Sequence, residues 1–168
     1  QRRSPDEDDR AQAREPLRGV QSKEGLFLAA LDHYAAGSVA RIRQILASTD
    51  IPLAEVRVFF RQLADSATEP EAQRSCLLVN TVLEVARHDP PLCERVNQHL
   101  AAVEALFRET LEAAQARGEL AADRDMEGLT AFLVTTIWGL WVRLAADVEP
   151  QRVRSVVEQV LQLLESSS

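Results

Sequence analysis

Glycine and proline are scarce in this chain of 168 residues, which contains 6 glycines and 7 prolines. Most of the prolines stand where a helix would have to begin or end, and the rest of the sequence is rich in Ala, Leu, Val, Glu and Arg, a mixture that favours helix. A chain of this length can bury one substantial core but is too short for two independent ones. We therefore expect an all-α fold with one core.

Long hydrophobic runs are also absent. The longest apolar stretch, AFLVTTIWGLWV from Ala131 to Val142, is shorter than the roughly 20 residues that a membrane-spanning helix needs. The N-terminus has no sequence of positive, then apolar, then small residues such as a signal peptide shows. These absences predict a cytoplasmic protein that has no membrane partner.

Cysteine is rare, and the two thiols, Cys76 and Cys93, fit neither a CxxC motif nor a disulfide framework. We interpret both as small buried hydrophobic side chains. His88, Cys93 and His99 do not have the spacing of a usual zinc site, and no fourth ligand is evident. We therefore expect no metal ion and no cofactor.

The motifs of common enzymes are missing as well. There is no Gly-rich phosphate loop, no GxSxG, no HExxH and no paired Glu-x-x-His of a di-iron bundle, which predicts that the protein is not an enzyme. The formal net charge of -7 argues against a free-standing nucleic-acid binder, because neutralising phosphates requires clustered Lys and Arg.

Helical periodicity is what the chain does have. Residues 1–21 are polar, mix both charge signs and are typical of a disordered or weakly helical arm, whereas apolar residues recur at helical spacing from Ser22 onward. Six helices are expected, at about 22–48, 52–68, 76–86, 90–117, 126–144 and 150–165, with Asp123 or Asp125 as the cap of the fifth. The third is apolar on nearly every side, which predicts a helix buried on all faces at the centre of the domain.

Three polar residues interrupt that apolar third helix. Asn80, Thr81 and Glu84 are three and four residues apart, so they share a helix face, and we expect them to be buried. They either line a cavity for a small, mostly apolar ligand or bond to neighbouring helices and hold the core in register. The wall of the cavity in the first alternative is completed by Phe59, Phe60, Leu63, Val103 and Phe107.

The fifth expected helix contains Trp138 and Trp141 on either side of Gly139. A glycine inside a helix costs about 1 kcal/mol relative to alanine, which a close approach of another helix would explain. The alternatives are a purely intramolecular core and a homodimer in which the last two helices pair with their copies as a four-helix bundle, and the breadth of the apolar faces favours the dimer. The expected interface residues are Phe132, Thr136, Leu140, Trp141, Leu144, Val153, Val157, Val160 and Leu164.

Three stretches carry a family resemblance. SKEGLF at 22–27 is similar to the opening of the fourth helix of TetR-family transcriptional regulators, SCLLVNTVLEVARHDPPL at 75–92 resembles their central helix with its Asp-Pro turn, and AFLVTTIWGLWV resembles their eighth helix. The resemblance implies that residues 22–168 are the ligand-binding and dimerisation domain of a regulator, a repressor by expectation. A ligand bound among the first five helices would then change the spacing of paired DNA-reading heads, which must lie about 34–36 Å apart.

The sequence departs from the family before residue 22. A three-helix DNA-binding domain, ending in an aromatic-x-x-Phe pattern, precedes SKEGLF in the family, but residues 17–21 contain no aromatic side chain. Either the chain is a truncated form, or parts of the helix-turn-helix are missing from this sequence, or the protein has lost it. Operator DNA is thus expected as a partner only through a helix-turn-helix that is not recognisable here. The alternative function is a helical protein-protein interaction module that senses no small molecule.

Overall fold

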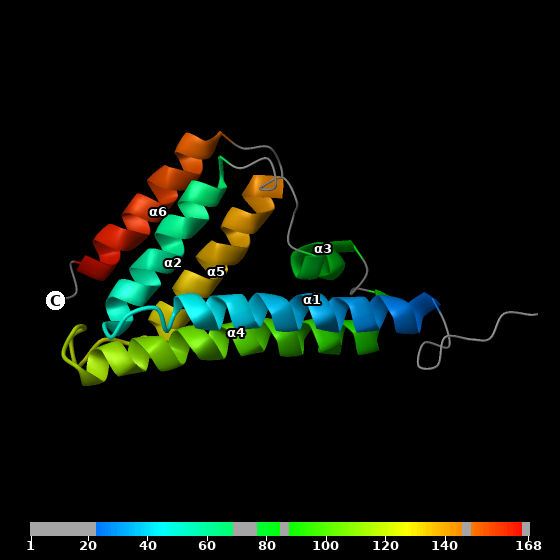
Figure 1. Ribbon diagram of the computed structural model, residues 1–168, viewed down its shortest axis with the longest axis horizontal. Helices are drawn as coiled ribbons and strands as arrows, with labels where there is room; N and C mark the ends of the chain where they lie inside the picture. The colour runs from blue at the N-terminus through cyan, green and yellow to red at the C-terminus, as the bar shows by residue number, and fades with distance from the viewer. Residues whose placement is uncertain (1–22, 69–76, 85–87, 146–148, 166–168) are drawn as a thin grey trace, which may run out of the picture.

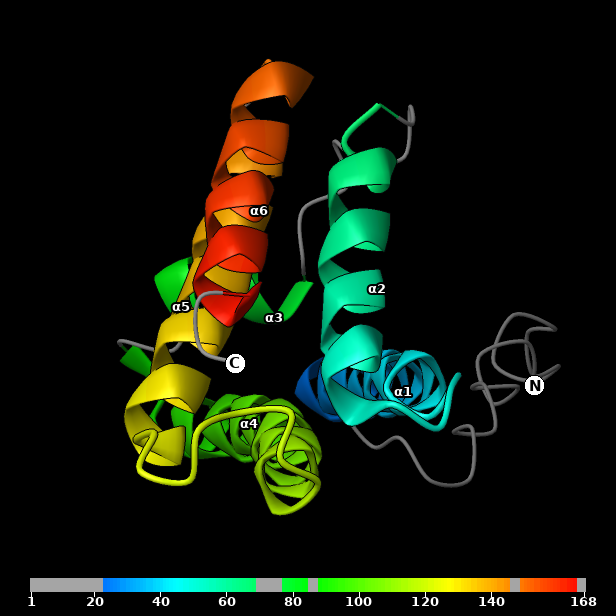
Figure 2. The ribbon, with the colours of Figure 1, turned by 90° about the vertical axis from the view of Figure 1, so that its left-hand side faces the viewer.

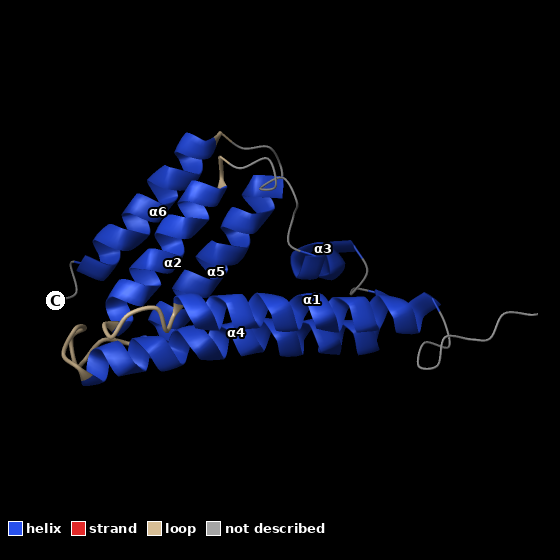
Figure 3. Cartoon of the chain, in the orientation of Figure 1, coloured by secondary structure: helices blue, strands red, loops and turns tan. Residues whose placement is uncertain are grey.

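The computed structural model describes residues 23–68, 77–84, 88–145 and 149–165. Six helices and their connecting turns make up these residues, and no strand occurs among them (Figure 3). The helices are α1 (Lys23–Ile45), α2 (Pro52–Ser66), α3 (Leu77–Glu84), α4 (Pro90–Ala116), α5 (Met126–Ala145) and α6 (Pro150–Glu165). The expected all-α fold is confirmed, and each observed helix lies within two or three residues of its expected bounds at the ends.

Local chemistry explains where α4 begins and ends. The side chain of Asp89 accepts a hydrogen bond of 3.0 Å from the backbone N–H of Leu92, and Pro90 fills the first helical position, where no N–H donor is needed. At the other end, Gly118 has a φ of 75°. The backbone N–H groups of Gly118 and Glu119 bond to the carbonyls of Gln115 and Ala114, which is a Schellman stop.

The start of α5 decides between the two expected caps. Asp125 accepts a 3.0 Å hydrogen bond from the backbone N–H of Gly128 and so satisfies one of the free donors of the first turn. By length and composition α5 could cross a membrane, the only described helix of which this is true. That is weak evidence, because core helices of soluble proteins pass the same test.

The helices form two groups that meet along α4. In Figure 1, α1 and α4 lie side by side along the long axis, and α2, α5 and α6 rise together from one end of that pair. Helix α3 lies apart from α2 and α6 in Figure 1, beside the first half of α4, and in Figure 2 it is seen behind α5 and α6.

Two hydrophobic clusters follow from this arrangement. The large cluster is formed by α2, the second half of α4, α5 and α6, whereas the small cluster comes from the first halves of α1 and α4 together with α3. The small cluster consists of five buried residues: Leu31, Ala35, Leu78, Leu92 and Val96. Trp138 and Trp141 of α5 pack against both clusters, so they form the joint between them.

Helix α3 does not occupy the central position expected from its sequence. Only Leu78 and Thr81 are buried on it, and the side chain of Leu83 is 55% exposed. Its helix lies at the edge of the domain, where α1, α4 and α5 cover it on one side (Figure 1). The expectation of burial on all faces is therefore wrong for the described residues 77–84; residues 76, 85 and 86 of the expected helix lie outside them.

Polar contacts join the two turns at the end of the domain from which α2 rises. The Glu119 carboxylate accepts a 2.8 Å hydrogen bond from the backbone N–H of Leu53 at the start of α2, and the Arg117 guanidinium donates to the carbonyl of Asp50. Glu55, which is 5% exposed, accepts from the backbone N–H of Thr49 at 3.0 Å. The bond from Leu53 supplies the first turn of α2 with a partner that its N-cap, Ile51, cannot provide, and the other two fix the turn that precedes the helix.

Candidate functional site

Five of the eight expected ligand-site residues meet in the large cluster. The ring of Phe59 packs edge-on against Phe107 with a centroid distance of 5.0 Å and against Phe60 at 5.7 Å, a geometry that aromatic pairs prefer. Phe60 and Phe107 are completely buried, and Leu63 and Val103 are buried in the same cluster. The structure thus brings the aromatic wall together, between α2 and α4.

The other three expected ligand-site residues lie elsewhere. Glu84 is exposed, Asn80 is half-buried and only Thr81 is buried. The Thr81 hydroxyl donates a 2.8 Å hydrogen bond to the carbonyl of Leu77 one turn earlier, which satisfies it within its own helix. The expectation that all three are buried together is wrong, because α3 packs through Leu78 and Thr81 and turns Glu84 outward.

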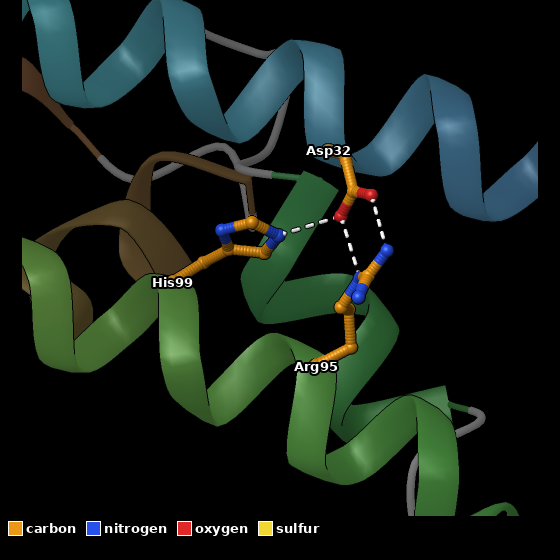
Figure 4. Close-up of polar contacts among 3 residues, drawn as sticks. All are labelled: Asp32, Arg95 and His99. Atoms are coloured by element: carbon orange, nitrogen blue, oxygen red, sulfur yellow. Dashed lines mark hydrogen bonds and ion pairs between the residues drawn. The ribbon is translucent and has the colours of Figure 1, made fainter.

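A polar cluster that the sequence did not reveal links α1 to α4 (Figure 4). Asp32 accepts hydrogen bonds from Nε and Nη2 of Arg95, at 3.0 and 2.7 Å, and contacts Nε2 of His99 at 2.9 Å. Because an ionised carboxylate only accepts, Nε2 of His99 carries the hydrogen in this contact. The hydrogen bonds from Arg95 and then from His99 lower the pKa of Asp32 below its ordinary value of 3.8. We call these three residues the ionic clasp.

The ionic clasp could only have been half predicted. Arg95 and His99 are four residues apart, a spacing that places them on one helix face, but nothing in the sequence identifies their partner 63 positions earlier than Arg95.

The other residues of the discarded zinc interpretation do not belong to the ionic clasp. Cys93 is a half-buried free thiol, contrary to the expected burial, and Cys76 lies outside the described residues. Among the described residues, no three His, Cys, Asp or Glu side chains are grouped to hold a metal ion.

Most of the expected dimer-interface residues face the core of their own chain. The periodic apolar stripe of each helix is the part covered by neighbouring helices of the same chain, and the residues buried in this way are Leu140, Leu144, Val153, Val157, Val160 and Leu164. Trp141 is half-buried at the joint of the two clusters. Those six residues therefore expose little surface on a single chain, whereas Phe132, 48% exposed, and the half-buried Thr136 and Trp141 reach the surface.

The opposite side of α5 is exposed and uncharged. No charged residue occurs on α5 between Glu127 and Arg143, and a row of residues on the side away from the core is exposed. We call this row the α5 outer face; it consists of Gly128, Ala131, Phe132, Thr135, Gly139 and Val142. On α6, Val156 and Leu163 are exposed as well, by 41% and 37%. The α5 outer face and Val156 are thus apolar or small residues at the surface of a single chain.

Comparison with known proteins gives consistent results. The family described as "Tetracyclin repressor-like, C-terminal domain" matches residues 52–160. An uncharacterized HTH-type transcriptional regulator of Bacillus subtilis, YezE, is 25% identical over 86% of this chain and 75% of its own length. The HTH-type transcriptional repressor ComR of Escherichia coli is also 25% identical, over 84% of this chain and 68% of its own. A solved structure of the TetR family transcriptional regulator CifR, a cysteine mutant complexed with 26 bp operator DNA, is 32% identical with a TM-score of 0.76, and the match covers 85% of this chain and 75% of CifR.

Proposed function

Because this chain belongs to the TetR family of transcriptional regulators, we propose that residues 22–168 form the sensing and dimerisation domain of a homodimeric, cytoplasmic repressor without enzymatic activity. Residues 1–21 are an arm outside this domain. Operator DNA is bound through a helix-turn-helix that is not recognisable in this sequence. Two of the relatives support this, since one is named a repressor and the other is complexed with operator DNA.

The observation that carries the homodimer is the uncharged α5 outer face. Exposed apolar side chains occur singly on most proteins, but a row that spans four turns of one helix without a charge marks an interaction surface. A second copy of the chain is the partner that offers the same surface in return, as a twofold-symmetric interface requires. The proposed interface contains Phe132 and Thr136 of α5 and Val156 of α6.

The observation that supports sensing is the joint between the two clusters. Trp138 and Trp141 contact both clusters and are only half-buried, and Phe59 and Phe107 belong to the large cluster that they contact. Aromatic and aliphatic walls are typical of sites for small, mostly apolar ligands. A ligand bound at this joint would shift the first half of α1 relative to α5, because those two elements belong to different clusters.

Sedimentation velocity tests the dimer. We expect the chain to sediment as a dimer at micromolar concentration and Phe132→Glu to sediment as a monomer, because a buried, unpaired charge opposes the contact. Thr68→Glu, an exposed substitution in the turn after α2, is the matched control and should leave the dimer intact. A monomeric wild-type chain would contradict the homodimer.

A thermal-shift screen with apolar and cationic aromatic compounds tests sensing. Ligands that bind the folded state raise the melting temperature by mass action, and Trp138→Ala should lose that shift. A stable dimer that no compound stabilises favours the alternative function, a helical protein-protein interaction module.

A further inference from the structure

Arg57 of α2 contains a buried nitrogen that has no hydrogen-bond partner. The Nε atom of its guanidinium group is cut off from solvent, and no other buried side-chain nitrogen or oxygen in the described part of the chain lacks a partner. A guanidinium group remains charged and can only donate hydrogen bonds. Burying a charged donor without an acceptor opposes folding. The position of Arg57 therefore requires an explanation other than the stability of the fold.

Arg95 shows how the same chain satisfies an arginine. Its Nε and Nη2 atoms donate to the two carboxylate oxygens of Asp32, at 3.0 and 2.7 Å. This fork of two donors matches the oxygens of a carboxylate or a phosphate. Arg57 has the same fork, but among the described residues no Asp or Glu forms an ion pair with it. The group that matches the fork of Arg57 is therefore an oxyanion from outside the chain.

A second arginine lies on the same face of α2. Arg61 follows Arg57 by four residues, a spacing that makes the two side chains neighbours on the helix, and it is exposed. Asp65 lies one turn further along, but it forms no ion pair with Arg61 or with any other described residue. Like charges one turn apart repel each other. This face of α2 therefore attracts anions, although the whole chain has a net charge of -7.

We propose that Arg57 and Arg61 bind a small oxyanion, which is the carboxylate of an organic acid or a free phosphate. Nε and one Nη atom of Arg57 donate to two of its oxygens, as Arg95 donates to Asp32, and Arg61 adds its charge from the solvent side. Arg57 is half-buried, so its guanidinium group lies at the border of the large cluster. Rotation about the aliphatic bonds of its side chain brings Nε to the surface, where an acceptor can reach it.

This site is separate from the joint between the two clusters and from the proposed dimer contact. It lies on α2, which packs against α4 and α6, whereas the joint is formed by Trp138 and Trp141 of α5. Leu53 and Phe60, which share the helix face of Arg57, belong to the large cluster. An oxyanion that binds only the folded chain stabilises it by mass action, and at this position it stabilises the large cluster.

An NMR titration tests the site at the nitrogen itself. Sodium benzoate or sodium phosphate, added to the wild-type chain at constant ionic strength, should shift the Nε–H signal of Arg57, which Arg57→Lys identifies by removing it. The Nε–H signal of Arg95 is the internal control and should not shift, because this nitrogen already donates to Asp32. A shift with benzoate alone assigns the site to an organic acid, a shift with phosphate alone assigns it to free phosphate, and a shift with both assigns it to oxyanions of either source. An Arg57 signal that neither salt shifts, or an equal shift of the Arg95 signal, overturns the proposal.

The affinity of variants separates the fork from the charge. Arg57→Met removes both, and Arg57→Lys keeps the charge but removes the fork, so each should raise the dissociation constant of the bound oxyanion about tenfold or more. Arg61→Met should raise it by a smaller factor. Arg41→Met, at an exposed arginine of α1, is the matched control and should change it by less than about twofold. Wild-type affinity in Arg57→Lys would show that charge alone attracts the anion and would overturn the role of the fork.

Urea denaturation in a Tris chloride buffer shows whether the loss of binding has a structural cause. Without added oxyanion, Arg57→Met should be at least as stable as the wild type, because the variant removes a buried donor that has no acceptor. Such a variant folds and fails to bind, which supports the site. A marked loss of stability in Arg57→Met would mean that the chain itself supplies an acceptor to Arg57, and this result overturns the proposal.

Discussion

The two clusters of this domain are built differently. The large cluster joins four helices through fully buried side chains, among them the interlocked rings of Phe59, Phe60 and Phe107. The small cluster has five buried residues and is held at its surface by the ionic clasp between α1 and α4. One cluster is therefore large and closely packed, whereas the other is small and is linked at its surface by contacts near solvent.

This difference indicates a division of labour. Close-packed interiors resist displacement, so the large cluster is suited to hold α5 and α6 in a fixed position for the proposed dimer contact. Regions with few buried contacts open at lower free energy, and the small cluster contains the first half of α1, the part nearest to residues 1–22. A structural change that must be transmitted to the N-terminal end of the chain therefore costs less free energy in the small cluster than in the large one.

The largest expected effect is the loss of an aromatic ring from the large cluster. Phe107→Ala should lower the free energy of unfolding by about 3–5 kcal/mol, because Phe107 is completely buried and its removal leaves a cavity. Leu78→Ala in the small cluster should lower it by about 2–3 kcal/mol, the lower part of the range for such a truncation. Urea denaturation of both variants measures the difference. A larger effect at Leu78 would contradict the ranking of the two clusters.

The next effect concerns local opening in the wild-type protein. Amides of α3 should exchange with solvent about 100-fold faster than those of residues 103–111 in α4, which corresponds to an opening free energy lower by about 2.7 kcal/mol. The physical reason is that eight residues of α3 bury only Leu78 and Thr81. Hydrogen exchange read by mass spectrometry gives both rates in one sample. Equal protection of the two segments would mean that the domain opens only as a whole.

The contrast also explains which parts could be predicted from the sequence. Helix ends depend on neighbouring residues, so the Asp89 cap and the Gly118 stop could be read directly. The aromatic wall could be found because apolar spacing on α2 and α4 marks the side that is buried. The degree of burial of α3 could not be predicted in this way. An apolar composition indicates that other elements must cover a helix, but it does not indicate how much of the helix surface they cover.

The exposure of the predicted interface residues could not be predicted for a related reason. The most regular apolar stripes of α5 and α6 predict the dimer surface, but the core of the same chain covers their buried residues, as Leu140 and Val157 show. The α5 outer face is marked by small residues and by the absence of charge, which is a weaker signal than hydrophobicity. The ionic clasp was missed because Asp32 and Arg95 come together only through the fold.

A smaller effect is expected from the ionic clasp, and it depends on pH. Asp32 has a pKa lowered by its hydrogen bonds, so the clasp stabilises the folded state above pH 3.8 and this contribution is lost as the pH falls through the lower, folded-state pKa. Asp32→Asn should therefore lower stability at pH 7 by less than Leu78→Ala does, since the pair is half-exposed. The difference from wild type should vanish in acid.

Urea titrations of wild type and Asp32→Asn at several pH values measure this dependence. Asp65→Asn, a substitution of an exposed aspartate on α2, is the control and should show no comparable difference at pH 7. If Asp32→Asn were as stable as wild type at pH 7, the small cluster would have to be held by its buried residues alone.

The smallest effect is expected at Glu84, where the sequence predicted a buried carboxylate on a ligand wall. Glu84 is the last residue of α3 and is exposed, so Glu84→Gln should change the free energy of unfolding by less than about 0.5 kcal/mol. The sign should be slightly stabilising, because a negative charge at the C-terminus of a helix opposes the helix dipole. The response to cationic aromatic compounds in a thermal-shift assay should also stay unchanged.

Glu94→Gln, at an exposed glutamate on α4, supplies the baseline for removing one surface charge. A selective loss of stabilisation by cationic compounds in Glu84→Gln would show that this carboxylate contacts the ligand after all, and would move the sensing site from the joint at Trp138 and Trp141 to α3.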